Sequence, residues 1–131
     1  MQLHEFLGQI QHRARLADMD QALRATRATF ETLAERIGGN EPKQLGAQLP
    51  EELGRFLDPK GDAQRFDSDE FLRRVSERAH TDLPVSVYHT RVVLEVLKEA
   101  VTPGEISDVL NQLPDDYKRL FSGSQGSMPQ A

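Results

Sequence analysis

Apolar residues recur along this chain at steps of three and four, which is the spacing of an amphipathic helix. Two matched stripes predict long helices over about 19–37 and 84–101. Their members are Leu23, Thr26, Phe30, Leu33 and Ile37 in the first helix, and Val87, Thr90, Leu94, Leu97 and Val101 in the second. The two threonines are expected to bond a backbone carbonyl one turn back, which allows them to be buried. Period-two alternation is missing, so the pattern predicts an all-α fold.

Shorter helices are predicted around these two from capping residues and helix breakers. They cover about 3–15, 41–48, 50–57 and 67–79, then a segment that begins at Thr102 and a last one from Pro114 to about Phe121. Asp18 is a predicted N-cap for the first long helix, and Gly38-Gly39-Asn40 is predicted to end it. Thr102 is a second predicted N-cap, with Glu105 reaching back to complete a capping box.

The sequence repeats itself at a distance of about 65 residues. Glu5-Phe6-Leu7 returns as Glu70-Phe71-Leu72, and Gln48-Leu49-Pro50 returns as Gln112-Leu113-Pro114. A repeat of this length is a supersecondary unit, and a unit of roughly 50 residues is marginally stable alone. We therefore expect a tandem duplication of a roughly four-helix unit, with about eight helices packed as a pseudo-two-fold helical bundle.

The expected domain is a single helical one over residues 1–121. It is made of repeats 3–57 and 67–121, joined by a linker at 58–66 in which proline and glycine break any helix. Residues 122–131 are rich in Ser, Gly, Gln and Pro, so a disordered tail is expected there.

Composition limits the possible functions more than it defines one. The 131 residues carry a net charge of −5 and include no cysteine, which excludes disulfides and thiolate chemistry. Neither half is basic, so we expect no nucleic-acid partner, and no basic amphipathic face or long apolar run indicates a membrane. The N-terminus does not resemble a signal peptide, and a cytoplasmic location is expected.

Candidate catalytic and metal-binding residues are few. The four histidines are His4, His12, His80 and His89, and each is interpreted as a structural or surface residue. The acidic pairs Glu51-Glu52 and Asp115-Asp116 each follow a proline, where carboxylates stabilise the first turn of a helix. No phosphate-binding loop, nucleophile elbow or zinc motif occurs. We therefore predict no catalytic residue, no metal, no cofactor and no enzyme activity.

Arg27 and Arg91 are the most interesting candidates, because they occupy the same place in each repeat. Each lies four residues before a glutamate, Glu31 or Glu95, so an ion pair within one helix is the simplest interpretation. A second interpretation has each arginine bridging to a carboxylate on a neighbouring helix. A third makes the pair a clamp for an anion or phosphate, which guanidinium groups bind in a bidentate way.

The second repeat contains a recognisable series of short sequence motifs. It runs through Phe71-Leu72-Arg73-Arg74-Val75, then Thr90-Arg91-Val92-Val93-Leu94-Glu95, then Pro103-Gly104-Glu105, and then Gln112-Leu113-Pro114 with Tyr117 and Phe121. This series resembles the bacterial domain of unknown function 2267 family, and the resemblance extends over both repeats, about 3–121. It implies a helical bacterial protein without an assigned activity, so it supplies no catalytic residues.

Two functional hypotheses follow. The first is a small protein-interaction or adaptor module without catalysis, which binds an unknown protein partner and is a monomer or weak homo-oligomer. The alternative is an anion-binding or nucleotide-binding module, possibly an enzyme, whose site lies between the repeats.

Overall fold

The computed structural model describes residues 1–59 and 61–122, which form helices and turns without a strand. The elements are α1 (Leu3–Ala14), α2 (Met19–Arg36), α3 (Glu41–Ala47), α4 (Glu51–Gly54), the 3-10 helix η1 (Arg55–Leu57), α5 (Ser68–Ala79), α6 (Leu83–Ala100), α7 (Pro103–Asn111), the 3-10 helix η2 (Asp115–Tyr117) and α8 (Lys118–Phe121). The prediction of an all-α bundle of about eight helices is confirmed. The predicted tail lies outside the described residues from residue 123 onward.

The helix ends follow the predicted caps, with one correction. Asp18 accepts a hydrogen bond from the Gln21 amide at 2.9 Å, as an N-cap should. The Thr102 hydroxyl accepts from the Glu105 amide at 3.3 Å, but the capping box predicted there is wrong in its second half. The Thr102 amide donates instead to Gln48 Oε1 at 2.8 Å. Glu105 is thereby released from capping.

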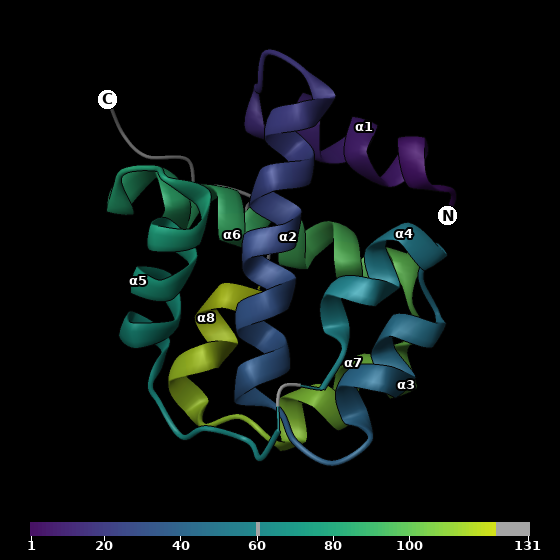
Figure 1. Cartoon of the computed structure of the whole chain (residues 1–131), viewed down its shortest axis with the longest axis vertical. Coiled ribbons are helices and arrows are strands. Elements are labelled where there is room, and N and C mark those ends of the chain that lie inside the picture. The colour runs from purple at the N-terminus through teal and green to yellow at the C-terminus, as the bar shows by residue number, and fades with distance from the viewer. Residues whose placement is uncertain (60, 123–131) are drawn as a thin grey trace.

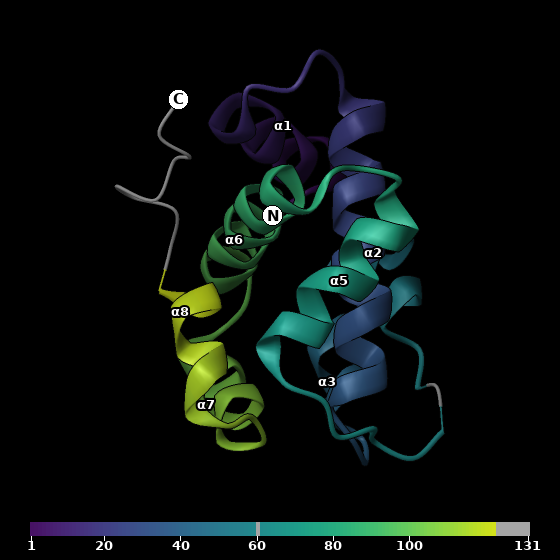
Figure 2. The same ribbon diagram turned by 90° about the vertical axis from the view of Figure 1, so that its left-hand side faces the viewer.

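The two long helices pack together at the centre of the molecule (Figures 1 and 2). α1 contacts both α2 and α6, and α5 contacts both α6 and α2. Each half of the chain therefore lays its first helix against the second helix of the other half. α3 meets α7 below this centre, and α8 packs on α6.

Aromatic rings and threonines fill the space between these helices. Phe6 of α1 and Phe30 of α2 meet edge to face with ring centroids 6.0 Å apart. The Thr26 hydroxyl donates to the Ala22 carbonyl at 2.8 Å, which confirms that prediction. The prediction is wrong for Thr90, whose buried hydroxyl oxygen has no hydrogen-bond partner among the described residues. Both Thr26 and Thr90 are fully buried.

Two arginines tie the halves together. Arg13 on α1 donates to both carboxylate oxygens of Glu99 on α6, at 2.7 Å each. Arg78 on α5 donates to both oxygens of Glu35 on α2, at 2.9 and 2.6 Å. Arg78 follows Arg13 by 65 positions, and Glu99 follows Glu35 by 64. The two bidentate pairs are therefore reciprocal, and planar bidentate geometry is the strongest form of this interaction.

Two glutamines form a second reciprocal contact. Gln48 accepts from the Thr102 amide ahead of α7, and Gln112 accepts from the Gly38 amide ahead of α3 at 3.0 Å. Each glutamine thus satisfies a backbone amide in the other half of the chain. This role accounts for the presence of glutamine at both positions.

Candidate functional site

A groove between α5 and α6, called here the α5–α6 groove, has an apolar floor and an acidic edge. Its floor is formed by Phe66, Leu72, Leu83 and Val87, and its edge by Asp67, Asp69, Glu70 and Arg73. The volume of the groove is about 700 Å³. Glu70 is paired with Arg73 and, at 2.8 Å, with Arg74 of the same helix, so the acidic character of the edge depends on Asp67 and Asp69. An apolar floor beside such an edge suits an apolar side chain flanked by cations.

The start of α6 leaves apolar side chains in water beside this groove. Leu83, the first residue of α6, is 47% exposed, and Val85 is 41% exposed. Pro84 fits the first turn of α6, because a backbone N–H at this position would have no carbonyl acceptor within the helix. The helix therefore begins with Leu83 pointing out of the core. Exposing this apolar side chain to water costs free energy, and a bound partner would remove that cost by covering it.

A related groove lies on the first half of the chain, between α1, α2 and η1, and has a volume of about 670 Å³. It is lined by Leu3, Leu7, Leu23, Arg27, Glu31, Glu52, Arg55, Phe56 and Asp58. Phe56 lies under Arg27, with the guanidinium carbon 5.4 Å from the ring centroid. The charges along this groove are mixed, so it offers less electrostatic discrimination than the α5–α6 groove.

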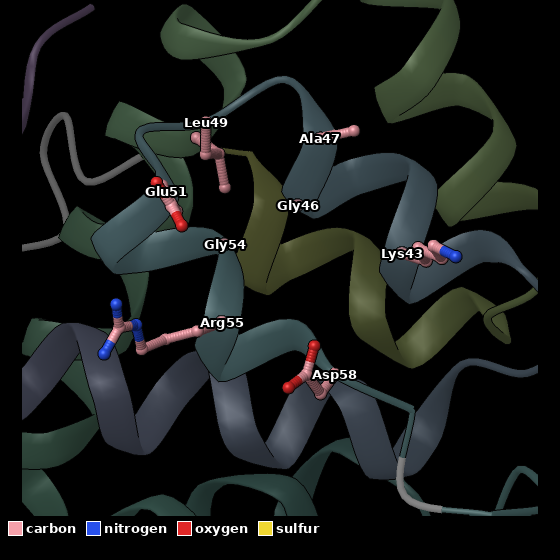
Figure 3. A pocket seen from close by; sticks show the side chains of 8 residues that line it. All are labelled: Lys43, Gly46, Ala47, Leu49, Glu51, Gly54, Arg55 and Asp58. Carbon is pink, nitrogen blue, oxygen red and sulfur yellow. The ribbon is translucent and has the colours of Figure 1, made fainter.

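The pocket beside α3 and α4 is shown in Figure 3. Gly46 and Gly54 bring the two helices into backbone contact, since a Cβ on Gly54 would lie 2.6 Å from the Gly46 carbonyl oxygen. Lys43 and Arg55 lie at opposite ends of the pocket in this view, and their side chains do not converge. Such an arrangement does not form a site for one small charged ligand.

A smaller pocket of about 160 Å³ lies between the two halves. Arg24 and Ala25 line it from the first half, and His89 lines it from the second. Burial lowers the pKa of His89 from its ordinary value of 6.5, so this ring is neutral at neutral pH. The volume is too small for a nucleotide.

Three carboxylates meet where α3 contacts α7. Glu41 begins α3, Glu105 lies in the first turn of α7, and Asp108 follows one turn later. One carboxylate oxygen from each residue lies within 4.8 Å of the other two. Burial and the adjacent Glu41 carboxylate raise the pKa of Glu105 to about 7. In the described part of the chain, these residues form the group best placed to hold a cation.

Arg27 and Arg91 have different surroundings. Arg27 is exposed and pairs with Glu31 through Nε at 3.2 Å, the geometry of an ion pair within one helix. Arg91 is half-buried, and its Nε has no hydrogen-bond partner among the described residues. Arg27 lines the groove on the first half, whereas Arg91 is not among the residues that line it. A common anion site formed by the two stays a prediction.

Comparison with known families gives one decisive match. The model of a family described as "Uncharacterized conserved protein (DUF2267)" matches residues 3–120. The chain belongs to the DUF2267 family. No curated protein matches the chain. The family description assigns no activity, so the function of this DUF2267 chain has to be argued from its own surface.

None of the described helices is both long and apolar enough to cross a bilayer.

Sequence reasoning missed the residues that connect the halves of this DUF2267 chain. Arg13 and Arg78 are 65 positions apart, the same spacing that separates Glu5-Phe6-Leu7 from Glu70-Phe71-Leu72, and that spacing was the available signal. Glu41 and Glu105 are 64 positions apart, as the later offset requires, and they meet in space. A comparison of charged positions across the repeat would have found both pairs.

Proposed function

We propose that this chain is a small protein-interaction module without catalytic activity, and that its α5–α6 groove binds one face of a basic amphipathic helix from a partner protein. The observation that carries the proposal is an apolar floor that includes the exposed side chain of Leu83 and is flanked by an acidic edge. Helix-in-groove recognition uses apolar side chains at steps of three and four, with flanking charges for orientation.

Charge selects the class of partner. Asp67 and Asp69 line the edge of the groove, so lysine or arginine at the flanks of a bound helix is favoured and glutamate is disfavoured. The chain as a whole carries a net charge of −5, which adds long-range attraction for a basic partner.

The remaining parts of the proposal concern origin and context. We infer that the halves are tandem copies of one unit, which is supported by the reciprocal arginine pairs and glutamine contacts. A bacterial cytoplasm and a monomer or weak homo-oligomer are the expected setting. In the pocket of Figure 3, the side chains of Lys43 and Arg55 do not converge on one point, as a catalytic site would require, so a binding role is favoured over a catalytic one.

Peptide display tests the binding proposal directly. A library of displayed helical peptides of about 18 residues is selected against the natural chain. Enriched sequences are then measured against Leu83→Asp and against Met19→Asp. Met19 is a matched control because it opens α2 as Leu83 opens α6, and it is 40% exposed. Both variants change an exposed position, so both are expected to fold.

The expected result is enrichment of amphipathic peptides with Lys or Arg at their flanks. Leu83→Asp should weaken their binding about tenfold or more, and Met19→Asp should leave it unchanged. Enriched peptides that are acidic, or that bind both variants equally well, would contradict the proposal. Self-association that disappears with Leu83→Asp would show instead that a second copy of the chain occupies the groove.

The anion-binding alternative has one supporting feature: the Nε of Arg91 is buried and has no hydrogen-bond partner among the described residues. Thermal-shift measurements with inorganic phosphate and with ATP test it, using Arg91→Gln as the variant. A saturable rise in Tm that Arg91→Gln removes would support this alternative, and no shift with either compound would count against it.

A further inference from the structure

The carboxylates of Glu41 and Glu105 present an electrostatic problem where α3 meets α7. Glu105 is 8% exposed, and its Oε2 is buried without a hydrogen-bond partner among the described residues. Glu41 Oε2 is buried and unpartnered in the same way. Burying an uncompensated carboxylate is costly, so these oxygens need either a proton or a positive partner.

The protein supplies no such partner in the part of the chain that the structure describes. The ion pairs formed there involve other residues and leave out Glu41, Glu105 and Asp108. The backbone amide that a capping box would offer to Glu105 is occupied by Gln48. The side chain of Glu105 therefore turns toward the other two carboxylates, within 4.8 Å of an oxygen from each.

We propose that Glu41, Glu105 and Asp108 bind one hard divalent cation of the Ca²⁺ or Mg²⁺ type, which links α3 to α7. Oxygen donors are the ligands such cations prefer, and three carboxylates supply enough charge to neutralise them. Asp108 is exposed, so the cation reaches the site from solvent and water completes its coordination shell.

Several features of the fold suit this role. Glu41 is the first residue of α3 and Glu105 lies in the first turn of α7, so both carboxylates are held by regular backbone where the two helices meet. They come from different halves of the chain, so the bound cation stabilises a contact between segments far apart in the sequence. A ligand that binds only the folded state raises stability in proportion to the logarithm of its concentration.

Thermal unfolding with added cations tests the proposal. Protein treated with EDTA and dialysed is titrated with CaCl₂ and, separately, MgCl₂, against KCl of equal ionic strength. A saturable rise in Tm on the order of 3–6 °C is expected at about 10 mM of the preferred cation. The double variant Glu41→Gln/Glu105→Gln should lose this rise. Because the amides remove the repulsion, it should fold at least as well as the natural chain without metal.

A matched control removes two other first-turn carboxylates. Glu51→Gln/Glu52→Gln changes the same formal charge on α4, where both residues are exposed. This control should keep the full response to the cation. Three outcomes would overturn the proposal: a shift no larger than that with KCl, an equal shift in both double variants, or a Tm that responds to acid but not to either cation. The last outcome would mean that a proton occupies the space between the glutamates.

Discussion

Two contacts join the halves of this molecule through reciprocal positions, and their electrostatics are opposite. In one contact, Arg78 and Arg13 each bind a carboxylate of the other half in bidentate geometry. In the other, the carboxyl groups of Glu41 and Glu105 lie together, and neither forms an ion pair with a cation among the described residues. A contact between equivalent positions of the two halves is attractive only when the two side chains carry opposite charges. Where like meets like, the charges repel unless a proton or a bound cation lies between them.

The largest effect is expected from breaking the compensated contact at Glu35. This carboxylate is 16% exposed and accepts from Arg78 and, at 3.2 Å, from Arg74. Glu35→Ala leaves both guanidinium groups without that partner, and a loss of about 2 kcal/mol in the free energy of unfolding is expected. Urea unfolding measures it. Glu77→Ala, an exposed position on α5, is the control and should cost less than about 0.5 kcal/mol.

The same contact should be sensitive to acid. The Arg78 hydrogen bond holds the pKa of Glu35 below its ordinary value of 4.5. The unfolded chain therefore takes up this proton first as the pH falls, and the stabilisation is lost through the folded-state pKa. Stability measured from pH 6 downward should fall more steeply in the natural chain than in Glu35→Ala. Parallel curves would show that Arg78 does not hold Glu35 ionised.

The next effect, of opposite sign, is expected at Glu105 in metal-free buffer. Its pKa is raised from 4.5 to about 7, so the folded state keeps a proton that the unfolded chain releases earlier. The associated stability is complete below pH 4.5 and is lost as the pH rises to about 7. Glu105→Gln should therefore be more stable than the natural chain at pH 8 by about 1–2 kcal/mol, and equal to it at pH 4. An equal difference at both pH values would contradict the raised pKa.

A smaller effect is expected from the reciprocal partner of Glu35. Glu99 is 47% exposed, and Arg13 keeps a second partner, Glu95, at 2.8 Å when Glu99 is removed. Glu99→Ala is therefore expected to cost about 0.5–1 kcal/mol by urea unfolding. A cost equal to that of Glu35→Ala would show that the two reciprocal pairs are energetically equivalent despite their different exposure.

The smallest effect is expected within one helix. Arg27 is 62% exposed on the side-chain scale and pairs with Glu31 on the same helix. Glu31→Gln should cost about 0.2–0.5 kcal/mol, and added salt should reduce that cost. This variant measures the energetic contribution of an ion pair within a single helix, for comparison with the pairs that join the two halves. A cost near 2 kcal/mol would assign Arg27 a larger role than its exposure supports.

The sequence predicts the helices of this protein well, because their signals are local. The stripes of the long helices and the cap at Asp18 act within a few residues. The predicted stop at Gly38-Gly39-Asn40 is right in position but not in detail, because α2 ends at Arg36 and Ile37 is already extended. The contacts between halves depend on side chains that are distant in sequence. Glu105 shows the limit, since its spacing from Thr102 fits a capping box, yet Gln48 from the other half takes that amide. Local spacing cannot reveal a distant competitor for the same hydrogen bond.

The candidate groove was beyond sequence reasoning for a related reason. Leu83 fits a helical pattern whether its side chain faces the core or water, and its 47% exposure follows from how α6 begins beside α5. Arg27 and Arg91 share a place in the repeated sequence pattern, but the structure gives them different surroundings. Arg27 is exposed and paired with Glu31, whereas Arg91 is half-buried.

The crossing of α1 onto α6 has a consequence for how the chain is made. Arg13 and Glu95 are in contact although they are 82 residues apart in the sequence. During synthesis, α1 leaves the ribosome long before α6 exists, so its apolar face has only α2 to cover it. The N-terminal half must wait for most of the protein to be translated before it reaches its final packing. Chaperones that bind nascent chains therefore have a defined interval in which to act on this molecule.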